Sequence, residues 1–229
     1  AQFEGVEAVG VAGRTRSMSP ETMAQELQPV FACFRALKTP VVHYKTCSTF
    51  DSSPEIGSIG KAIDVGQAAF GSSFVPLVVG APILRRYCVF GNLFAKSGLD
   101  SDVFRLDRHP TMRHHPITPM EESDLRVHLS RQTEKQIALF DVLQLSGNRV
   151  QEAFDVLMQT RPDVVLFDTL NDRDLAPIGE AIWRKAAKDA PLFVAGSSGA
   201  EYALAAHWRE KGWIPELPER PRADGVDQL

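Results

Sequence analysis

The chain has 229 residues, with 44% hydrophobic and 24% charged side chains and a formal net charge of −4 at pH 7. This size and balance are typical of one large α/β domain with a substantial core. A negative net charge does not indicate a basic face, so we do not expect nucleic acid as a partner. The longest nearly apolar stretch, residues 74–84, is too short for a membrane span, so we do not expect a membrane as a partner.

In the first third of the chain, short apolar runs alternate with helical patterns. A helix is predicted from Pro20, with Ser19 as its N-cap, and Pro29 should kink or divide that helix. A second helical pattern begins near Pro54 and continues to Phe70. The strands expected around these helices lie at residues 8–12, 41–45 and 76–80.

The middle of the chain is less regular. Residues 87–90 and 103–106 are predicted to pair as a hairpin across GNLFAKSGLD. The Pro-rich segment RHPTMRHHPITPM, residues 108–120, should form an ordered loop or an extended arm, and a helix should follow at residues 121–131.

The last third shows the clearest alternation of strands and helices. Strands are expected at residues 137–141, 164–167 and 192–195, and helices at residues 150–158, 175–182 and after GSSG. Intervals of about 30 residues between strands are typical of βαβ units. We therefore predict a three-layer, Rossmann-like α/β domain whose mostly parallel sheet is covered by helices on both faces.

The segment from Tyr44 to Gly60 is the first candidate site. It has Lys45 at the end of a strand, followed by a polar loop that leads to a helix N-terminus, where anions are commonly bound. The polar side chains of this loop that could bind a ligand are Ser48, Thr49, Asp51 and Ser52. A Ser/Asp-rich helix cap behind a buried strand explains the same residues without a ligand.

Two further strand ends carry polar loops that would lie at the same edge of a parallel sheet. Arg14 and Arg16 follow the first predicted strand, and Gly196, Ser197, Ser198 and Gly199 follow the last. Together these loops suit a small, hydroxylated anion, because arginine binds a carboxylate through two parallel hydrogen bonds. Solvent-exposed arginines and a tight βα turn are the alternative interpretations. A serine hydrolase that uses Ser197 or Ser198 is disfavoured, because the sequence around these serines does not match the GxSxG motif.

The histidines and Asp168 have simpler interpretations. His109, His114 and His115 match no compact zinc pattern, so we expect no metal site, although one or two of them could donate to an anion. Asp168 ends a buried strand and should cap the next helix. Three widely spaced cysteines without a CxxC pattern, and no secretory leader, predict reduced thiols in a cytoplasmic protein.

Several stretches resemble the four-carbon acid sugar kinases, and the resemblance covers the chain up to its Pro-rich end. They are VGVAGRTRSMSP, HYKTCSTFDSSPEIGSIG, PLVVGAPILRRYCVFGNLFA, FRLDRHPTMRHHPITPM, VVLFDTLND and VAGSSGAEYAL. Members of that family have an N-terminal domain that binds an acid sugar such as threonate, erythronate or an oxo-tetronate, and a C-terminal domain that binds ATP. At the positions of Arg113 and His114 the family usually has serine and arginine, so the resemblance implies no role for these two side chains.

By this resemblance, residues 1–213 correspond to the acid-sugar-binding domain, and residues 214–229 to a Pro-rich linker toward an absent nucleotide-binding domain. The family's first strand, with its DDxTG-type acidic motif, is missing from the sequence, so the catalytic base stays unassigned. The implied function is the sugar-binding part of a kinase that uses ATP and Mg²⁺, with this chain alone inactive and binding neither. A non-catalytic binding or interaction module derived from such a kinase is the alternative, and a homodimer is left open.

Overall fold

The structure is a computed structural model that describes residues 6–98, 100–186 and 191–215. Its centre is a five-stranded sheet in which all strands run parallel, in the order β1-β8-β2-β7-β6. The strands are β1 (Val41–Lys45), β2 (Val75–Val78), β6 (Ile137–Phe140), β7 (Val164–Phe167) and β8 (Leu192–Gly196). The three central strands are buried along their whole length, as expected for continuous apolar runs in a parallel sheet.

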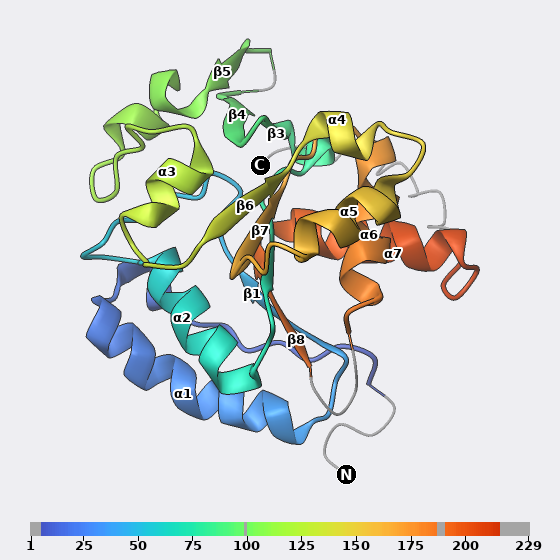
Figure 1. Ribbon diagram of the computed structural model, residues 1–229. Coiled ribbons are helices and arrows are strands. Elements are labelled where there is room, and N and C mark those ends of the chain that lie inside the picture. The colour runs from blue at the N-terminus through green and yellow to red at the C-terminus, as the bar shows by residue number, and fades with distance from the viewer. Residues whose placement is uncertain (1–5, 99, 187–190, 216–229) are drawn as a thin grey trace, which may run out of the picture.

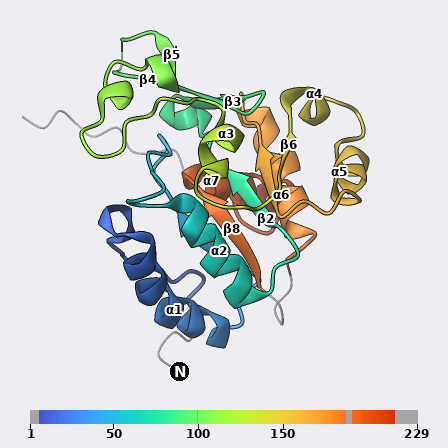
Figure 2. The ribbon, with the colours of Figure 1, turned by 60° about the vertical axis from the view of Figure 1, so that its left-hand side comes forward.

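Helices cover both faces of this sheet, so the predicted three-layer α/β fold is confirmed (Figure 1). On one face lie α1 (Pro20–Ala36), α2 (Ile59–Phe70) and α3 (Leu125–Ser130), and α1 and α2 run side by side (Figure 2). On the other face lie α4 (Val142–Leu145), α5 (Val150–Met158), α6 (Leu175–Trp183) and α7 (Ser198–Glu210). Among the described helices none is long and apolar enough to cross a bilayer.

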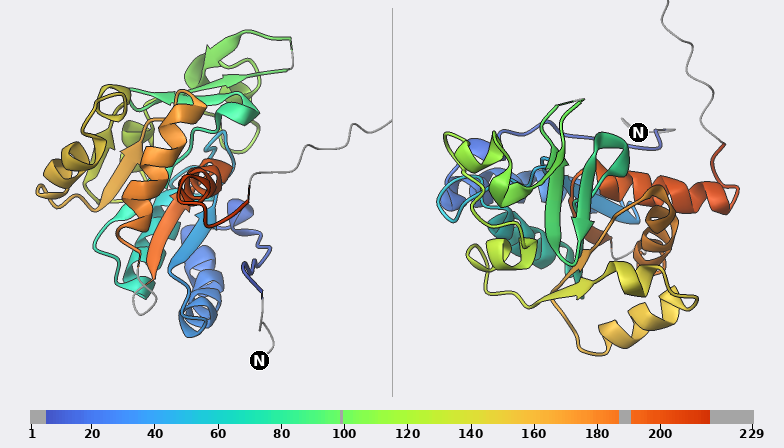
Figure 3. Two further views of the ribbon diagram at one scale, coloured as in Figure 1. Left: turned by 90° about the vertical axis from the view of Figure 1, so that its right-hand side faces the viewer. Right: turned by 90° about the horizontal axis from the view of Figure 1, so that it is seen from above.

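A small antiparallel sheet lies over the carboxyl ends of the large sheet (Figure 3). Its strands are β3 (Arg86–Val89), β4 (Asn92–Lys96) and β5 (Val103–Arg105). β3 pairs with β4 across Phe90 and Gly91, which have φ angles of 49° and 79° and form a tight turn. The predicted pairing of residues 87–90 with 103–106 is therefore wrong, because the intervening GNLFAK segment supplies the central strand.

One predicted strand is wrong, and two predicted helices are present but begin later than expected. Residues 8–12 form no strand and are mostly exposed. The helix expected near Pro54 begins at Ile59, with Ser58 as its N-cap, because residues 54–57 form a bend. The helix expected at residues 121–131 begins only at Leu125, since Asp124 caps it.

Pro29 lies inside α1 without dividing it. The helix continues unbroken from Pro20 to Ala36, so the prediction of a division is wrong. Pro29 is exposed, whereas Leu27 and Phe31 on either side of it are buried. Because both halves of the helix are packed on the same core, the ring of Pro29 is accommodated on the solvent side. The predicted linker at residues 214–229 lies almost entirely outside the described residues.

Candidate functional site

The carboxyl edge of the large sheet brings two of the predicted loops together. β1 and β8 are neighbours, and their register aligns Lys45 with Gly196. The Thr46 backbone N–H donates to the Gly196 carbonyl at 2.7 Å, so the polar loop after β1 starts beside the Gly196–Gly199 loop. Lys45 itself is exposed at this edge. The expected convergence of these two loops at one rim is therefore present in the structure.

The third loop, which carries Arg14 and Arg16, is fixed to the same edge. A short 3-10 helix (Thr15–Ser17) lies against β1, where the Thr15 hydroxyl is 2.8 Å from the Tyr44 hydroxyl. The Gly57 N–H donates to the Met18 carbonyl at 2.9 Å. Gly57 has a φ of 63°, and a Cβ there would overlap the Arg16 carbonyl oxygen, so only glycine allows this close approach.

The centre of the site is an ion pair between Arg16 and Asp51. The Asp51 side chain is fully buried, and the Thr49 hydroxyl donates to its second oxygen at 2.6 Å. The Arg16 side chain, by contrast, is 59% exposed. Because a guanidinium has five N–H donors, Arg16 can bind Asp51 and still present donors to a ligand from solvent. Arg14 lies exposed on the same turn.

Ser52 faces inward, toward residues that the sequence analysis did not identify. Its hydroxyl is 3.0 Å from His128 Nε2 and accepts from Gln132 Nε2 at 2.9 Å. Gln132 Oε1 also accepts from the Gly60 N–H at 3.2 Å, at the start of α2. In the sequence, the signal that could have indicated this network is the spacing of His128 and Gln132, which are four residues apart beside the buried leucines of α3. It fixes the site loop to α2 and α3.

Burial of His128 gives a testable pH dependence. Burial, and then the nearby positive charge of Arg131, lowers the pKa of His128 to about 4 from its ordinary value of 6.5. The unfolded chain therefore binds a proton between pH 6.5 and 4 that the folded chain excludes, so stability is lost as the pH falls through this window. We expect about 2 kcal/mol less unfolding free energy at pH 4.5 than at pH 7 from this histidine alone.

Urea unfolding of the parent chain and the His128→Gln variant at both pH values measures this contribution. The variant should lack that part of the pH dependence, whereas His114→Gln, an exposed histidine, should keep it. An equal pH dependence in His128→Gln and the parent would contradict the prediction.

Lys45 has an acidic neighbour on α7. Glu201 Oε1 lies 3.4 Å from His43 Nδ1, and His43 Nε2 lies 3.2 Å from the Gly196 carbonyl. The contact with His43, and to a smaller extent the charge of Lys45, lowers the pKa of Glu201. The carboxylate of Glu201 therefore stays ionised beside Lys45 and moderates the positive potential of the rim without removing it.

The Gly196–Gly199 loop has a clear structural role. The Ser197 hydroxyl is fully buried, donates to the Val79 carbonyl at 2.7 Å and accepts from the Gly199 N–H at 3.0 Å, as an N-cap does. A nucleophilic role for Ser197 would require breaking both bonds. Ser198 is half-buried and is the side chain of this loop that is nearer to solvent.

The histidines have separate tasks. His109 Nδ1 accepts from the N–H groups of Thr111 and Met112 at 3.2 Å each, and His115 Nδ1 accepts from the Thr118 N–H at 3.1 Å. His114 is exposed. Within the part of the chain that the structure describes, no three His, Cys, Asp or Glu residues are grouped to hold a metal ion.

Asp168 does not cap the next helix, so that prediction is wrong. Its buried carboxylate accepts from the N–H groups of Phe90, Gly91 and Val142 at 2.6, 2.9 and 3.1 Å. It therefore ties the small sheet and α4 to the end of β7. Burial raises the pKa of Asp168, although the three N–H donors act in the opposite direction. Asn171 and Asp174 cap the following 3-10 turn instead.

Comparison with known proteins identifies the family. Residues 1–204 match the model of the sugar-binding N-terminal domain family. The chain belongs to this family. It is 48% identical over 229 residues to the 3-oxo-isoapionate kinase of Paraburkholderia graminis, covering all of this chain and 48% of that protein. It is 30% identical over 213 residues to the 3-oxo-tetronate kinase of Salmonella typhimurium, covering 92% of this chain and 47% of that protein.

These matches confirm the resemblance to acid sugar kinases, and the chain spans about half the length of the curated relatives it matches. A crystal structure from Salmonella typhimurium LT2 superposes with a TM-score of 0.78 at 29% identity, covering 91% of this chain and 47% of that one. A Bordetella bronchiseptica structure with bound citrate, at 19% identity, has a TM-score of 0.66 and covers 86% of this chain and 44% of that one. The latter likeness supports the fold alone.

Proposed function

We propose that this chain is the sugar-acid-binding part of an ATP-dependent kinase that phosphorylates four-carbon or closely related acid sugars. The observation that carries the proposal is the position of Arg16. Its guanidinium binds a buried carboxylate, yet its side chain remains 59% exposed, on a turn fixed to Tyr44, the residue before Lys45. A permanent cation held in one orientation is suited to bidentate binding of a substrate carboxylate.

The proposed division of roles follows from exposure. Arg14, Arg16 and Lys45, which face solvent, bind the carboxylate, and Ser48, which is half-buried, contacts a hydroxyl. Thr49, Asp51 and Ser52 are buried behind them and fix the loop, contacting substrate hydroxyls only if Arg16 moves. The Gly196–Gly199 loop adds the positive end of the α7 dipole.

Within the residues that the structure describes, we find no arrangement of side chains suited to hold ATP or Mg²⁺. Asp51 is paired with Arg16, the described carboxylates form no metal-ligand group, and the Gly196–Gly199 loop lacks the lysine of a Walker motif. We propose that nucleotide and metal bind outside this chain, and that the chain alone binds and orients the acid sugar without transferring phosphate.

Calorimetry with the D- and L-forms of threonate and erythronate tests the proposal. At least one acid should bind, whereas erythritol, which has the hydroxyls without the carboxylate, should not. Arg16→Gln and Lys45→Gln should each weaken binding about tenfold or more, because each removes a charge-assisted hydrogen bond.

The matched control is Arg35→Gln, an exposed arginine on α1. It should leave the affinity unchanged. Heat from none of the four acids would count against a sugar-acid site and in favour of a non-catalytic module with another ligand.

A further inference from the structure

A cavity lies outside the proposed sugar-acid site, in the segment that follows β5. It has a volume of about 540 Å³ and is lined by Asp107, Arg108, Arg113, His114 and Glu121. None of the residues assigned to the acid sugar lines it. Its volume is within the range of small-molecule sites in proteins, which is about 300 to 1,000 Å³.

The walls of this cavity are held by a rigid backbone. Residues 106–108 and 112–114 form two 3-10 helices, and the buried His109 ring caps the second of them. The Arg113 N–H donates to the His109 carbonyl at 3.0 Å, and the Met120 N–H donates to the Met112 carbonyl at 2.9 Å. Because little backbone ordering is needed, a ligand can bind with a small entropic penalty.

The charged side chains that line the cavity differ in whether they form ion pairs. The Asp107 carboxylate is bound by Arg105 through two hydrogen bonds of 2.7 and 2.5 Å, and this contact lowers the pKa of Asp107. Arg108 and Arg113, in contrast, form no ion pair within 4 Å of any described residue, although the charge of Arg108 also contributes to the lowered pKa of Asp107, and Glu121 forms none either. The cavity therefore offers two unpaired guanidinium groups, one unpaired carboxylate and the His114 ring.

We propose that this cavity is a second ligand site, for a small hydroxylated anion. Arg108 and Arg113 bind its carboxylate or phosphate group, and Glu121 accepts a hydrogen bond from one of its hydroxyls. Glu121 repels every anion, and a ligand whose hydroxyl lies away from its charged group offsets this repulsion by donating a hydrogen bond to the Glu121 carboxylate. The ligand's anionic group could be that of a sugar acid or of a sugar phosphate, and both share the recognised chemistry.

Titration of the ¹⁵N-labelled chain at constant ionic strength tests this site, with amide shifts of residues 105–121 as the readout. The probes are D-threonate, glycerol 3-phosphate, inorganic phosphate and erythritol. Saturable shifts in this segment are expected for threonate or glycerol 3-phosphate, and the tighter of the two identifies the anionic group. Inorganic phosphate should bind at least fivefold more weakly than that probe, and erythritol should not bind.

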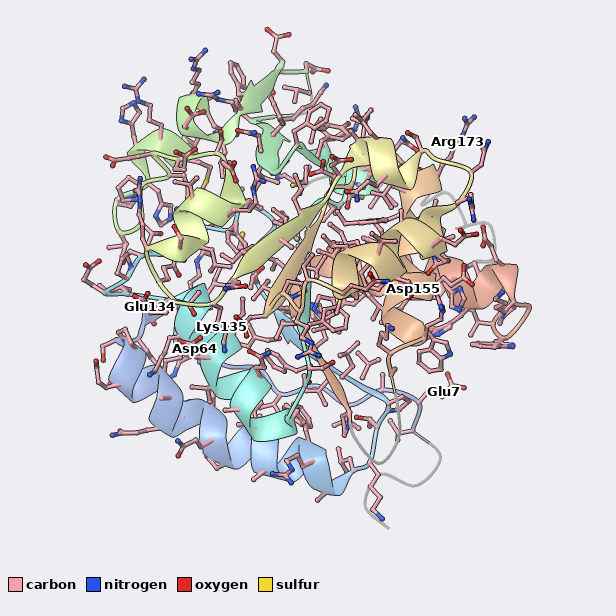
Figure 4. All side chains as sticks on the ribbon, in the orientation of Figure 1. Glu7, Asp64, Glu134, Lys135, Asp155 and Arg173 are labelled. Carbon is pink, nitrogen blue, oxygen red and sulfur yellow. The ribbon has the colours of Figure 1, made fainter. Side chains whose placement is uncertain are left out.

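Substitutions separate this site from the first one. Arg108→Gln and Arg113→Gln should each weaken binding of the tighter hydroxylated anion at least fivefold. Glu121→Gln should reduce the difference in affinity between that anion and inorganic phosphate. Arg173→Gln, an exposed arginine on the 3-10 turn before α6 and far from this segment in Figure 4, should change nothing. Arg16→Gln should leave these shifts intact, so failure of the sugar-acid site and failure of this one are distinguishable.

Two results would overturn the proposal. One is the absence of saturable shifts at residues 105–121 with both hydroxylated anions. The other is equal weakening by Arg113→Gln and Arg173→Gln, which would indicate nonspecific attraction of anions.

Discussion

Replacing Asp168 by alanine is expected to lower the free energy of unfolding by about 3 to 5 kcal/mol. The carboxylate is buried at the end of β7 and accepts three backbone N–H groups, from Phe90, Gly91 and Val142. Its removal leaves these donors without a partner. Each unsatisfied buried donor costs about 1 to 3 kcal/mol, and water can reach part of the exposed turn at Phe90.

Denaturant unfolding measures this loss, and amide hydrogen exchange shows where it occurs. Exchange at Phe90, Gly91 and Val142 should accelerate more than exchange in β1 and β8. Asp168→Asn keeps one acceptor oxygen and should cost less than alanine. The matched control is Asp172→Ala, an exposed carboxylate four residues later, which should change stability by less than about 0.5 kcal/mol. Similar losses for both alanine variants would contradict the role of Asp168.

The importance of Asp168 was not predictable from the sequence, whereas the strand that precedes it was. Residues 164–167 are a continuous apolar run, and such runs identify buried parallel strands without further information. The partners of Asp168 are 26 to 78 residues away along the chain. Local patterns therefore identify the element but not the tertiary contacts at its end.

The small sheet shows a second limit of the sequence. Its first turn contains Phe90 with a φ of 49°. A turn of this kind is recognised in a sequence by asparagine or glycine at that position, and phenylalanine does not indicate it. Without that signal, the sequence predicts a loop from Asn92 to Lys96, where the structure has the central strand. Packing against the carboxyl edge of the large sheet, through the bridge between Cys88 and Thr169, compensates for the unusual turn residue.

The candidate site was predictable to the extent that it follows from topology. Loops after parallel strands share one edge, so the proximity of Lys45 to the Gly196–Gly199 loop could be expected. The pairing of Arg16 with Asp51 could not, since the segment before Arg16 is not a strand and the turn is positioned by Tyr44 and Gly57. The direction of Ser52, toward His128, likewise depends on a contact across 76 residues.

Substituting Gly199 by alanine should destabilise the chain by about 3 kcal/mol or more, although alanine normally stabilises a helix by about 1 kcal/mol relative to glycine. Gly199 is the second residue of α7, and a Cβ there would overlap the Gly80 carbonyl oxygen at the end of β2. The start of α7 cannot move away freely, because the Ser197 N–H donates to the Val78 carbonyl at 2.9 Å and the Ser197 hydroxyl donates to the Val79 carbonyl at 2.7 Å. Helix and strand must therefore separate.

The decisive measurement is whether Gly199→Ala lowers or raises the free energy of unfolding. Urea unfolding should show a loss for Gly199→Ala, whereas Gly10→Ala, which has no atom within 4 Å of its Cβ position, should be nearly neutral. Ser198→Ala, one residue earlier in α7, should also retain most of the stability. A neutral or stabilising Gly199→Ala would mean that α7 does not approach β2 as closely as described. Because this approach positions the Gly196–Gly199 loop beside Lys45, any folded Gly199→Ala protein should also bind the acid sugar more weakly than Ser198→Ala does.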